Sequence, residues 1–276
     1  MATTRWTGTT SGAWATAGNW SNGVPTTGDT VLFPRTGVTN APSTGLSLDT
    51  TNFAKLIVER GATYNIGSSG SPLICVTPYL LHEGIGTFYF NFEDSTAYAG
   101  AERGHLVCRS SNLQNAMVIA GTDAFAQLDL VSGRVTTGNT GAGTSRVFIQ
   151  PETGGINQAS IVILTGVTVT SLVNDGGTVT IDPGGVVTTL AQNSGRTINT
   201  AQLNSGIVYM YGGIWDQRYT APTGLTIYAM GGLFETNNVI GAIVGSLYIG
   251  VRATINRGPA YQFATGEFEI GQEFSI

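Results

Sequence analysis

Two acidic side chains occupy equivalent positions in the clearest internal repeat of the chain. Tyr209–Asp216 reads YMYGGIWD, and nineteen residues later Tyr228–Glu235 reads YAMGGLFE. If the two copies stack as neighbouring rungs, Asp216 and Glu235 lie about 5 Å apart, which is the separation of the carboxylates in retaining glycosidases. A carboxylate at a turn is also a common structural choice. The pair is therefore a candidate for glycan cleavage, with a structural role as the favoured interpretation.

Aromatic side chains gather around the same repeat. Outward rings close to polar side chains can hold a saccharide, whereas rings that stack on one another or against a second subunit serve assembly. The sequence leaves both interpretations open and favours assembly. The residues concerned are Tyr209, Tyr211, Trp215, Tyr228, Phe234 and Tyr248.

Other catalytic and cofactor chemistry finds little support in the sequence. Cys75 and Cys108 lie in the apolar contexts LICVT and HLVCR, where we expect buried free thiols. His82 and His105 do not complete a zinc-ligand spacing with them. Neither histidine accompanies a Gly-x-Ser-x-Gly nucleophile motif. We therefore expect no enzyme, no cofactor and no metal site.

The elements that would position these residues are short strands joined at glycine corners. Double glycines recur before β-type residues, and the run TVTID lies between two of them. There Val179 and Ile181 should face a core while Thr178 and Thr180 face outward, because successive strand residues point to opposite faces. Glycine permits the positive φ angles that corners require.

A period near 20 residues predicts a solenoid. Besides the double glycines, Ile207, Ile227 and Leu247 recur at intervals of 20. Short strands at such a period are typical of a right-handed parallel β-helix, whose turns stack about 4.8 Å apart. The predicted fold is therefore all-β, a parallel β-solenoid with an irregular N-terminal cap. The alternative is an antiparallel β-sandwich or jelly roll.

Composition narrows the classes of partner. The chain has 276 residues with 39 glycines, and charged residues make up only 11%. A net charge of -5 disfavours a broad nucleic-acid surface. There is no apolar span of 18 residues, and the opening MATTRWTGTT lacks the pattern of a secretory signal. We expect neither a nucleic-acid nor a membrane partner, and a protein that folds in a cytoplasm.

The chain divides into three expected parts, which are a cap with the first strand at 1–50, a solenoid body at 51–256 and a strand or tail at 257–276. A solenoid exposes apolar core and unpaired strand edges at its ends, so its ends need lids. Large indoles in an irregular segment suit that task. The predicted cap residues are Trp6, Trp14, Trp20, Pro25 and Asp29.

The tail reads EFEIGQEFSI, in which apolar and acidic residues alternate. Phe268, Ile270 and Phe274 would form one apolar face of a strand. This strand is either the last strand of the fold with charged gatekeepers, or a segment that pairs with an edge on a neighbouring subunit.

The opening segment also carries a resemblance. Trp14, then Asn19-Trp20, Pro25 and Asp29-x-Val31-x-Phe33 resemble the opening of β-solenoid proteins from phage virions, bacterial adhesins and autotransporter passengers. The resemblance covers about residues 6 to 33. It implies that this segment leads into the first rungs of a solenoid.

Among these families, the absence of an export signal favours a virion protein. The resemblance then implies a structural protein that decorates or cements a phage capsid. Its partners would be further copies of itself, as a homotrimer, and the major capsid protein, in a virion assembled in the host cytoplasm. The alternative is a receptor-binding spike or adhesin that recognises surface glycans, and the third possibility is a polysaccharide-degrading enzyme.

Overall fold

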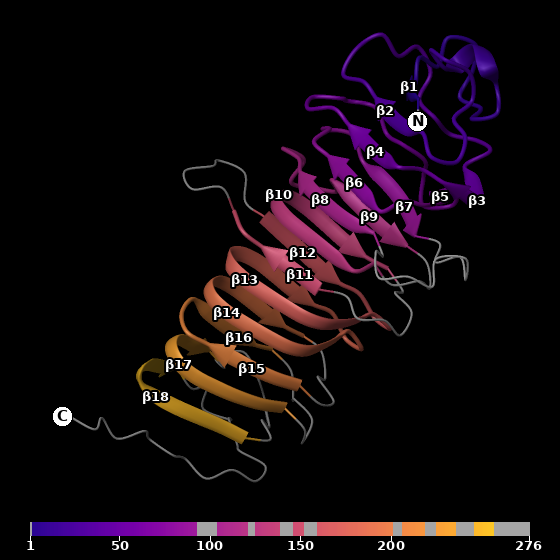
Figure 1. Cartoon of the computed structure of the whole chain (residues 1–276). Coiled ribbons are helices and arrows are strands. Elements are labelled where there is room, and N and C mark those ends of the chain that lie inside the picture. The colour runs from indigo at the N-terminus through magenta and orange to yellow at the C-terminus, as the bar shows by residue number, and fades with distance from the viewer. Residues whose placement is uncertain are drawn as a thin grey trace.

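The chain is a stack of parallel strands along one axis (Figure 1). The computed structural model describes residues 2–92, 104–120, 125–138, 146–151, 159–200, 206–218, 225–235 and 246–256. Within these ranges one short 3-10 helix, η1 (Ala17–Asn19), accompanies the strands. The strands β1 and β18 lie at opposite ends of the stack (Figure 1).

The strands of the described residues are β1 (Thr3–Arg5), β2 (Thr30–Phe33), β3 (Ser47–Asn52), β4 (Lys55–Val58), β5 (Leu73–Val76), β6 (Tyr79–His82), β7 (Phe88–Phe92), β8 (His105–Arg109), β9 (Met117–Ala120), β10 (Gln127–Thr137), β11 (Arg146–Ile149), β12 (Ala159–Ile163), β13 (Thr168–Ile181), β14 (Val186–Asn199), β15 (Gly206–Met210), β16 (Ile214–Gln217), β17 (Leu225–Glu235) and β18 (Ser246–Asn256). The strand β3 crosses the boundary expected at residue 50.

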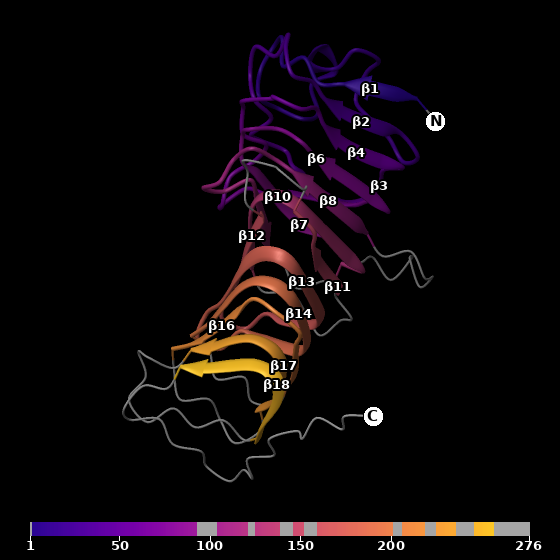
Figure 2. The ribbon, with the colours of Figure 1, turned by 90° about the vertical axis from the view of Figure 1, so that its left-hand side faces the viewer.

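The strands form two parallel ladders that enclose one core. The first ladder runs β1-β2-β4-β6-β8-β10-β11-β13-β14-β15-β17-β18. The second runs β3-β5-β7-β9-β10-β12-β13-β14-β16-β17-β18. The long strands bend and contribute to both ladders, as β13, β14 and β17 show in Figure 2. The predicted β-solenoid is confirmed, and the antiparallel alternative is wrong because every pairing between these strands is parallel.

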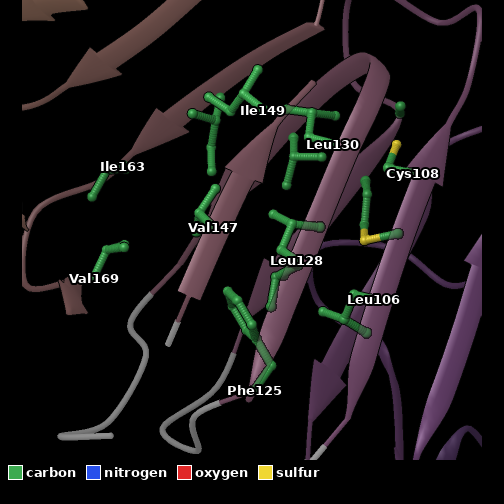
Figure 3. Packing of buried hydrophobic residues seen from close by; sticks show 14 of the residues in the cluster. Leu106, Cys108, Phe125, Leu128, Leu130, Val147, Ile149, Ile163 and Val169 are labelled. Atoms are coloured by element: carbon green, nitrogen blue, oxygen red, sulfur yellow. The ribbon is translucent and has the colours of Figure 1, made fainter. Parts of the chain in front are cut away.

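Stacked aliphatic side chains fill the core behind the first ladder. Each is buried and in register with the next, so the stack continues from β2 to β18. Figure 3 shows Leu106, Leu128 and Val147 of this stack on successive strands. Its members are Val31, Leu56, Leu80, Leu106, Leu128, Val147, Leu172, Leu190, Val208, Ile227 and Leu247.

Strand alternation places most core residues as expected. Val179 and Ile181 are fully buried, as the sequence predicted. Ile207 is not equivalent to Ile227 and Leu247, because it faces outward and is 40% exposed whereas they are buried. Its neighbour Val208 is the register partner of Ile227. A shift of one residue moves a strand side chain to the opposite face, so the interval of 20 was one residue too long at this rung.

A column of glycines turns the corner between the two ladders in the second half of the chain. Gly195, Gly213 and Gly232 have φ angles of 76°, 74° and 84°, which side chains with a Cβ rarely adopt. A Cβ on each would also lie well inside contact distance of a glycine carbonyl oxygen on the preceding rung. The double-glycine motif is therefore explained by two requirements of the corner, which are a positive φ angle and close stacking of the backbone on the preceding rung.

The substitution Gly213→Ala tests this corner. We expect it to lower the free energy of unfolding by about 2–4 kcal/mol, because alanine combines backbone strain with a collision against the Gly195 carbonyl. Gly23→Ala is the matched control, since Gly23 has a φ of 80° but no atom near its Cβ position. Its cost should be about 1 kcal/mol. Equal losses in denaturant unfolding would contradict the stacking explanation.

Candidate functional site

Three indoles form one buried cluster at the β1 end of the solenoid. The ring centroids of Trp6 and Trp20 are 4.8 Å apart, and those of Trp14 and Trp20 are 4.6 Å apart, both edge to face. Trp14 also lies 6.2 Å from Phe33 and 5.8 Å from Phe53, which belong to the core of the first rungs. The cluster therefore joins the irregular segment to the solenoid core, as expected of a cap.

The polar groups of this cap are bonded within it. The indole N–H of Trp6 donates to the carbonyl oxygen of Asn40 at 2.8 Å, and that of Trp20 donates to the carbonyl oxygen of Trp14 at 2.7 Å. The buried amide of Asn19 accepts from the backbone N–H of Thr10 at 2.9 Å. Hydrogen bonds of this kind hold a segment that has no regular secondary structure.

Asp29 connects the cap to the ladder. Its carboxylate accepts from the backbone N–H groups of Thr26 and Ala2, at 3.0 and 2.9 Å, and these bonds lower its pKa. Pro25 is buried close by in the sequence. The expectation that Asp29 leads into the first strand is wrong, because β1 precedes the cap and pairs with β2. Only tertiary pairing reveals β1, since three residues carry no usable alternation.

The two candidate carboxylates are register partners on β16 and β17, as the repeat predicted. Asp216 is only 3% exposed. The guanidinium of Arg218 donates to it from Nε at 3.0 Å and from Nη2 at 2.9 Å. Arg196 donates to the same oxygen of Asp216 and lies 3.5 Å from the carboxylate of Glu235. Arg196 thus bridges the two carboxylates, and Arg218 holds Asp216 alone.

This network assigns Asp216 an ionised state. Burial by itself would raise the pKa of Asp216, but the hydrogen bonds from Arg218 and Arg196 outweigh burial and hold the pKa below its ordinary value. The same contact raises the pKa of Arg218. The general acid of a glycosidase needs a raised pKa so that it carries a proton near neutral pH. The geometry therefore suits an ion-pair network better than an acid and nucleophile pair.

The substitution Asp216→Asn tests the structural role. We expect it to lower the free energy of unfolding by about 1.5–3 kcal/mol near neutral pH, because Arg196 and Arg218 lose their buried ionic acceptor. The pKa of Asp216 is depressed in the folded state, so its contribution is present above about pH 3.8 and is lost as pH falls through the lowered pKa. The penalty should therefore shrink in acid. The control is Asp182→Asn, because Asp182 is half-exposed. If Asp216→Asn at neutral pH changed stability as little as this control does, the structural role of Asp216 would be contradicted.

The predicted aromatic platform separates into two sets. Trp215 and Phe234 are fully buried, so their assignment to an exposed platform is wrong. Strand alternation turns them inward, where Trp215 is in register with Thr197 and with Phe234. The indole N–H of Trp215 donates to the side-chain oxygen of Gln217 at 2.9 Å. These two rings are core residues.

The tyrosines form a ladder on the outer face of the solenoid. The rings of Tyr209 and Tyr228 are 5.3 Å apart and within 10° of parallel, and those of Tyr228 and Tyr248 are 4.8 Å apart and within 9°. Stacking covers both faces of the middle ring, Tyr228, and one face each of Tyr209 and Tyr248. A saccharide packs on an open ring face, so this arrangement suits packing against protein better than glycan binding.

A second set of apolar side chains lies on the neighbouring corner. Tyr211 is 57% exposed, Met230 is 47% exposed and Val251 is 57% exposed. They occupy successive rungs, because the Cβ position of Gly231 meets the backbone of Tyr211 and that of Gly250 meets the backbone of Met230. The tyrosine ladder therefore has an exposed apolar border.

The tyrosine ladder is the end of a longer feature that the sequence analysis missed. One outward position of the first ladder is apolar on nearly every rung, and we name it the outer stripe. Most of its side chains are half-buried between their neighbours. In register order its members are Leu32, Ile57, Leu81, Val107, Asp129, Phe148, Val173, Ala191, Tyr209, Tyr228 and Tyr248. The number of residues between successive members of the outer stripe varies, so no regular period in the sequence reveals the stripe.

The outer stripe differs from the corresponding outward position of the second ladder. There Thr136, Thr180 and Asp216 alternate with apolar residues such as Val162 and Ile198. Asp129 is the one charged member of the outer stripe. Its carboxylate lies 2.7 Å from Nε2 of His105 and accepts from Gln127 at 2.8 Å.

The remaining expected sites give a mixed result. Cys75 and Cys108 are buried free thiols, as predicted, and burial raises the pKa of Cys108 to about 12. The tail residues Phe268, Ile270 and Phe274 lie outside the described residues. Across the described ranges, no three His, Cys, Asp or Glu side chains converge as metal ligands. Over the same ranges, no helix has the length and apolarity to span a membrane.

Comparison with protein-family models, with curated proteins and with solved structures finds no match for this chain.

Proposed function

We propose that the chain is a structural protein of a bacteriophage particle, a capsid decoration or cement protein that acts as a homo-oligomer. The observation that carries the proposal is the outer stripe, an apolar surface that follows the solenoid from β2 to β18. An elongated apolar surface with a polar border is typical of a protein interface. Its work would be mechanical, holding neighbouring copies and the major capsid protein together.

Three further features support this proposal. The opening segment resembles that of virion β-solenoids. The carboxylates that best suited catalysis are held by arginines, and the tyrosine rings cover one another. The indole cap and the continuous apolar core suit a protein that bears load. The phage setting itself rests on the resemblance of residues 6 to 33.

Quantitative mass spectrometry of purified particles tests the proposal. A decoration protein should be present in many copies, in a fixed ratio to the major capsid protein, and particles without it should lose their contents at lower temperature. A few copies per particle would indicate the glycan-binding spike instead. The protein would instead be a polysaccharide-degrading enzyme if it were absent from particles and cleaved a polysaccharide in a panel, and if Asp216→Asn abolished that cleavage.

A further inference from the structure

We propose that the outer stripe binds a second copy of this chain, with the two solenoids parallel, in register and related by a twofold axis along the solenoid. This inference deepens the proposed function and takes its biological setting from it. The partner, the face and the orientation are argued below from the side chains of the first ladder.

The size of the surface fits a pair of copies. The outer stripe spans ten rung spacings of about 4.8 Å, which gives a length of about 48 Å. On each strand the surface also includes the outward side chains two residues before and two residues after the stripe member. Its width is therefore five residues, or about 17 Å. The resulting ~800 Å² per copy equals the standard area that each partner contributes to a stable protein interface. Because the described part of each chain has one such stripe, packing face to face closes at two copies, in place of the trimer that the resemblance implied.

Most charges on the two borders of the outer stripe differ in sign. Lys55 and Arg146 lie two residues before the stripe members on their strands, whereas Glu59, Glu83 and Asp175 lie two residues after theirs, on the border that also carries Arg109. A twofold axis along the solenoid reverses the strand direction of the second copy and keeps each rung at its own level. Lys55 of one copy then lies opposite Glu59 of the other, so this rung pairs opposite charges at both borders.

The antiparallel arrangement lacks this match. A twofold axis along the strands places each border against itself and inverts the order of the rungs. Arg146, on the middle rung of the outer stripe, would then face Arg146 of the other copy. Electrostatic complementarity of this kind fixes orientation and register.

Asp129 is the weak point of the parallel arrangement. At its level the two carboxylates meet across the axis, and like charges at close range repel. Each carboxylate keeps His105 and Gln127 of its own chain as partners. The arrangement therefore predicts that removal of this charge strengthens association, a gain that misfolding cannot produce.

Sedimentation of the full chain over a range of concentrations tests the interface. We expect a dimer, with the mass falling to one copy for Leu81→Lys, which places a charge in the outer stripe. Thr180→Lys is the matched control on the outward face of the second ladder, and it should remain a dimer. Asp129→Asn should dimerise about tenfold more tightly. A monomer or trimer for the native chain, or a dimer that Leu81→Lys leaves unchanged, would overturn the proposal.

Cysteine cross-linking tests the orientation. Ile57→Cys should form a disulfide with the same residue of the second copy under mild oxidation, because the parallel arrangement brings equal rungs together. Phe148→Cys lies on the middle rung and should cross-link in either orientation, so it reports that the faces meet. Cross-linking of Phe148→Cys without Ile57→Cys would overturn the parallel arrangement. A dimer in solution from a chain that is missing from particles would confirm the interface and contradict the proposed function.

Discussion

Replacement of Trp14 by alanine should lower the free energy of unfolding by about 3–5 kcal/mol, which is the usual cost of removing a fully buried large aromatic side chain. Trp14 is 1% exposed. It contacts Trp6 and Trp20 within the cap and Phe33 and Phe53 in the core. The loss therefore removes the link between the cap and the first rungs, and leaves a cavity that the bonded cap cannot easily close.

The matched control for this substitution is Tyr211→Ala. Tyr211 is also a large aromatic residue but is 57% exposed at the outer corner, so its loss should change stability by less than about 0.5 kcal/mol. Chemical denaturation of both variants gives the comparison. A second readout is aggregation, because an uncapped solenoid exposes a strand edge and apolar core. Equal, small effects for the two variants would contradict the assignment of the indoles to a cap.

Stability should also fall in mild acid because of His82. The imidazole of His82 is buried in the core 6.0 Å from the ring of Phe88, and burial lowers its pKa from 6.5 to about 4. Between these two values the unfolded chain binds a proton that the folded chain does not. The free energy of unfolding should therefore decrease by about 3 kcal/mol as pH falls from about 6.5 to about 4, and this contribution should level off below.

The substitution His82→Leu tests the cause. Leucine fills a similar volume between Val58 and Cys108, its register partners, and does not titrate. The slope of stability against pH over this window should flatten by the amount attributed to His82. A His82→Leu profile as steep as that of the native chain would contradict the explanation.

Local patterns of the sequence were enough for the fold class and for part of the candidate site. Double glycines and alternating runs predicted a β-solenoid, because a corner and an inward face are properties of a few adjacent residues. The same reasoning placed Val179 and Ile181 in the core and Asp216 beside Glu235. The indoles in a segment without period predicted a cap, since exposed indole is unfavourable.

Register between rungs was decided by the tertiary structure. Core partners are 25 residues apart at Val31 and Leu56 but 18 apart at Leu172 and Leu190. The length of each turn depends on its corners and connections, which the alternation of a strand does not encode. For this reason the period was visible only in the second half of the chain, and Val208, one residue after Ile207, is the register partner of Ile227.

The sequence by itself thus determined that the chain is a capped β-solenoid, because inward alternation, glycine corners and buried indoles are local requirements. Only the tertiary structure decided which side chains share a surface. In the tertiary structure Trp215 and Phe234 point into the core, and Arg196 lies between two carboxylates. The outer stripe is aligned there over residues 32 to 248. The physical reason is that strand faces alternate every residue, so a surface that crosses many rungs depends on the length of every turn between them.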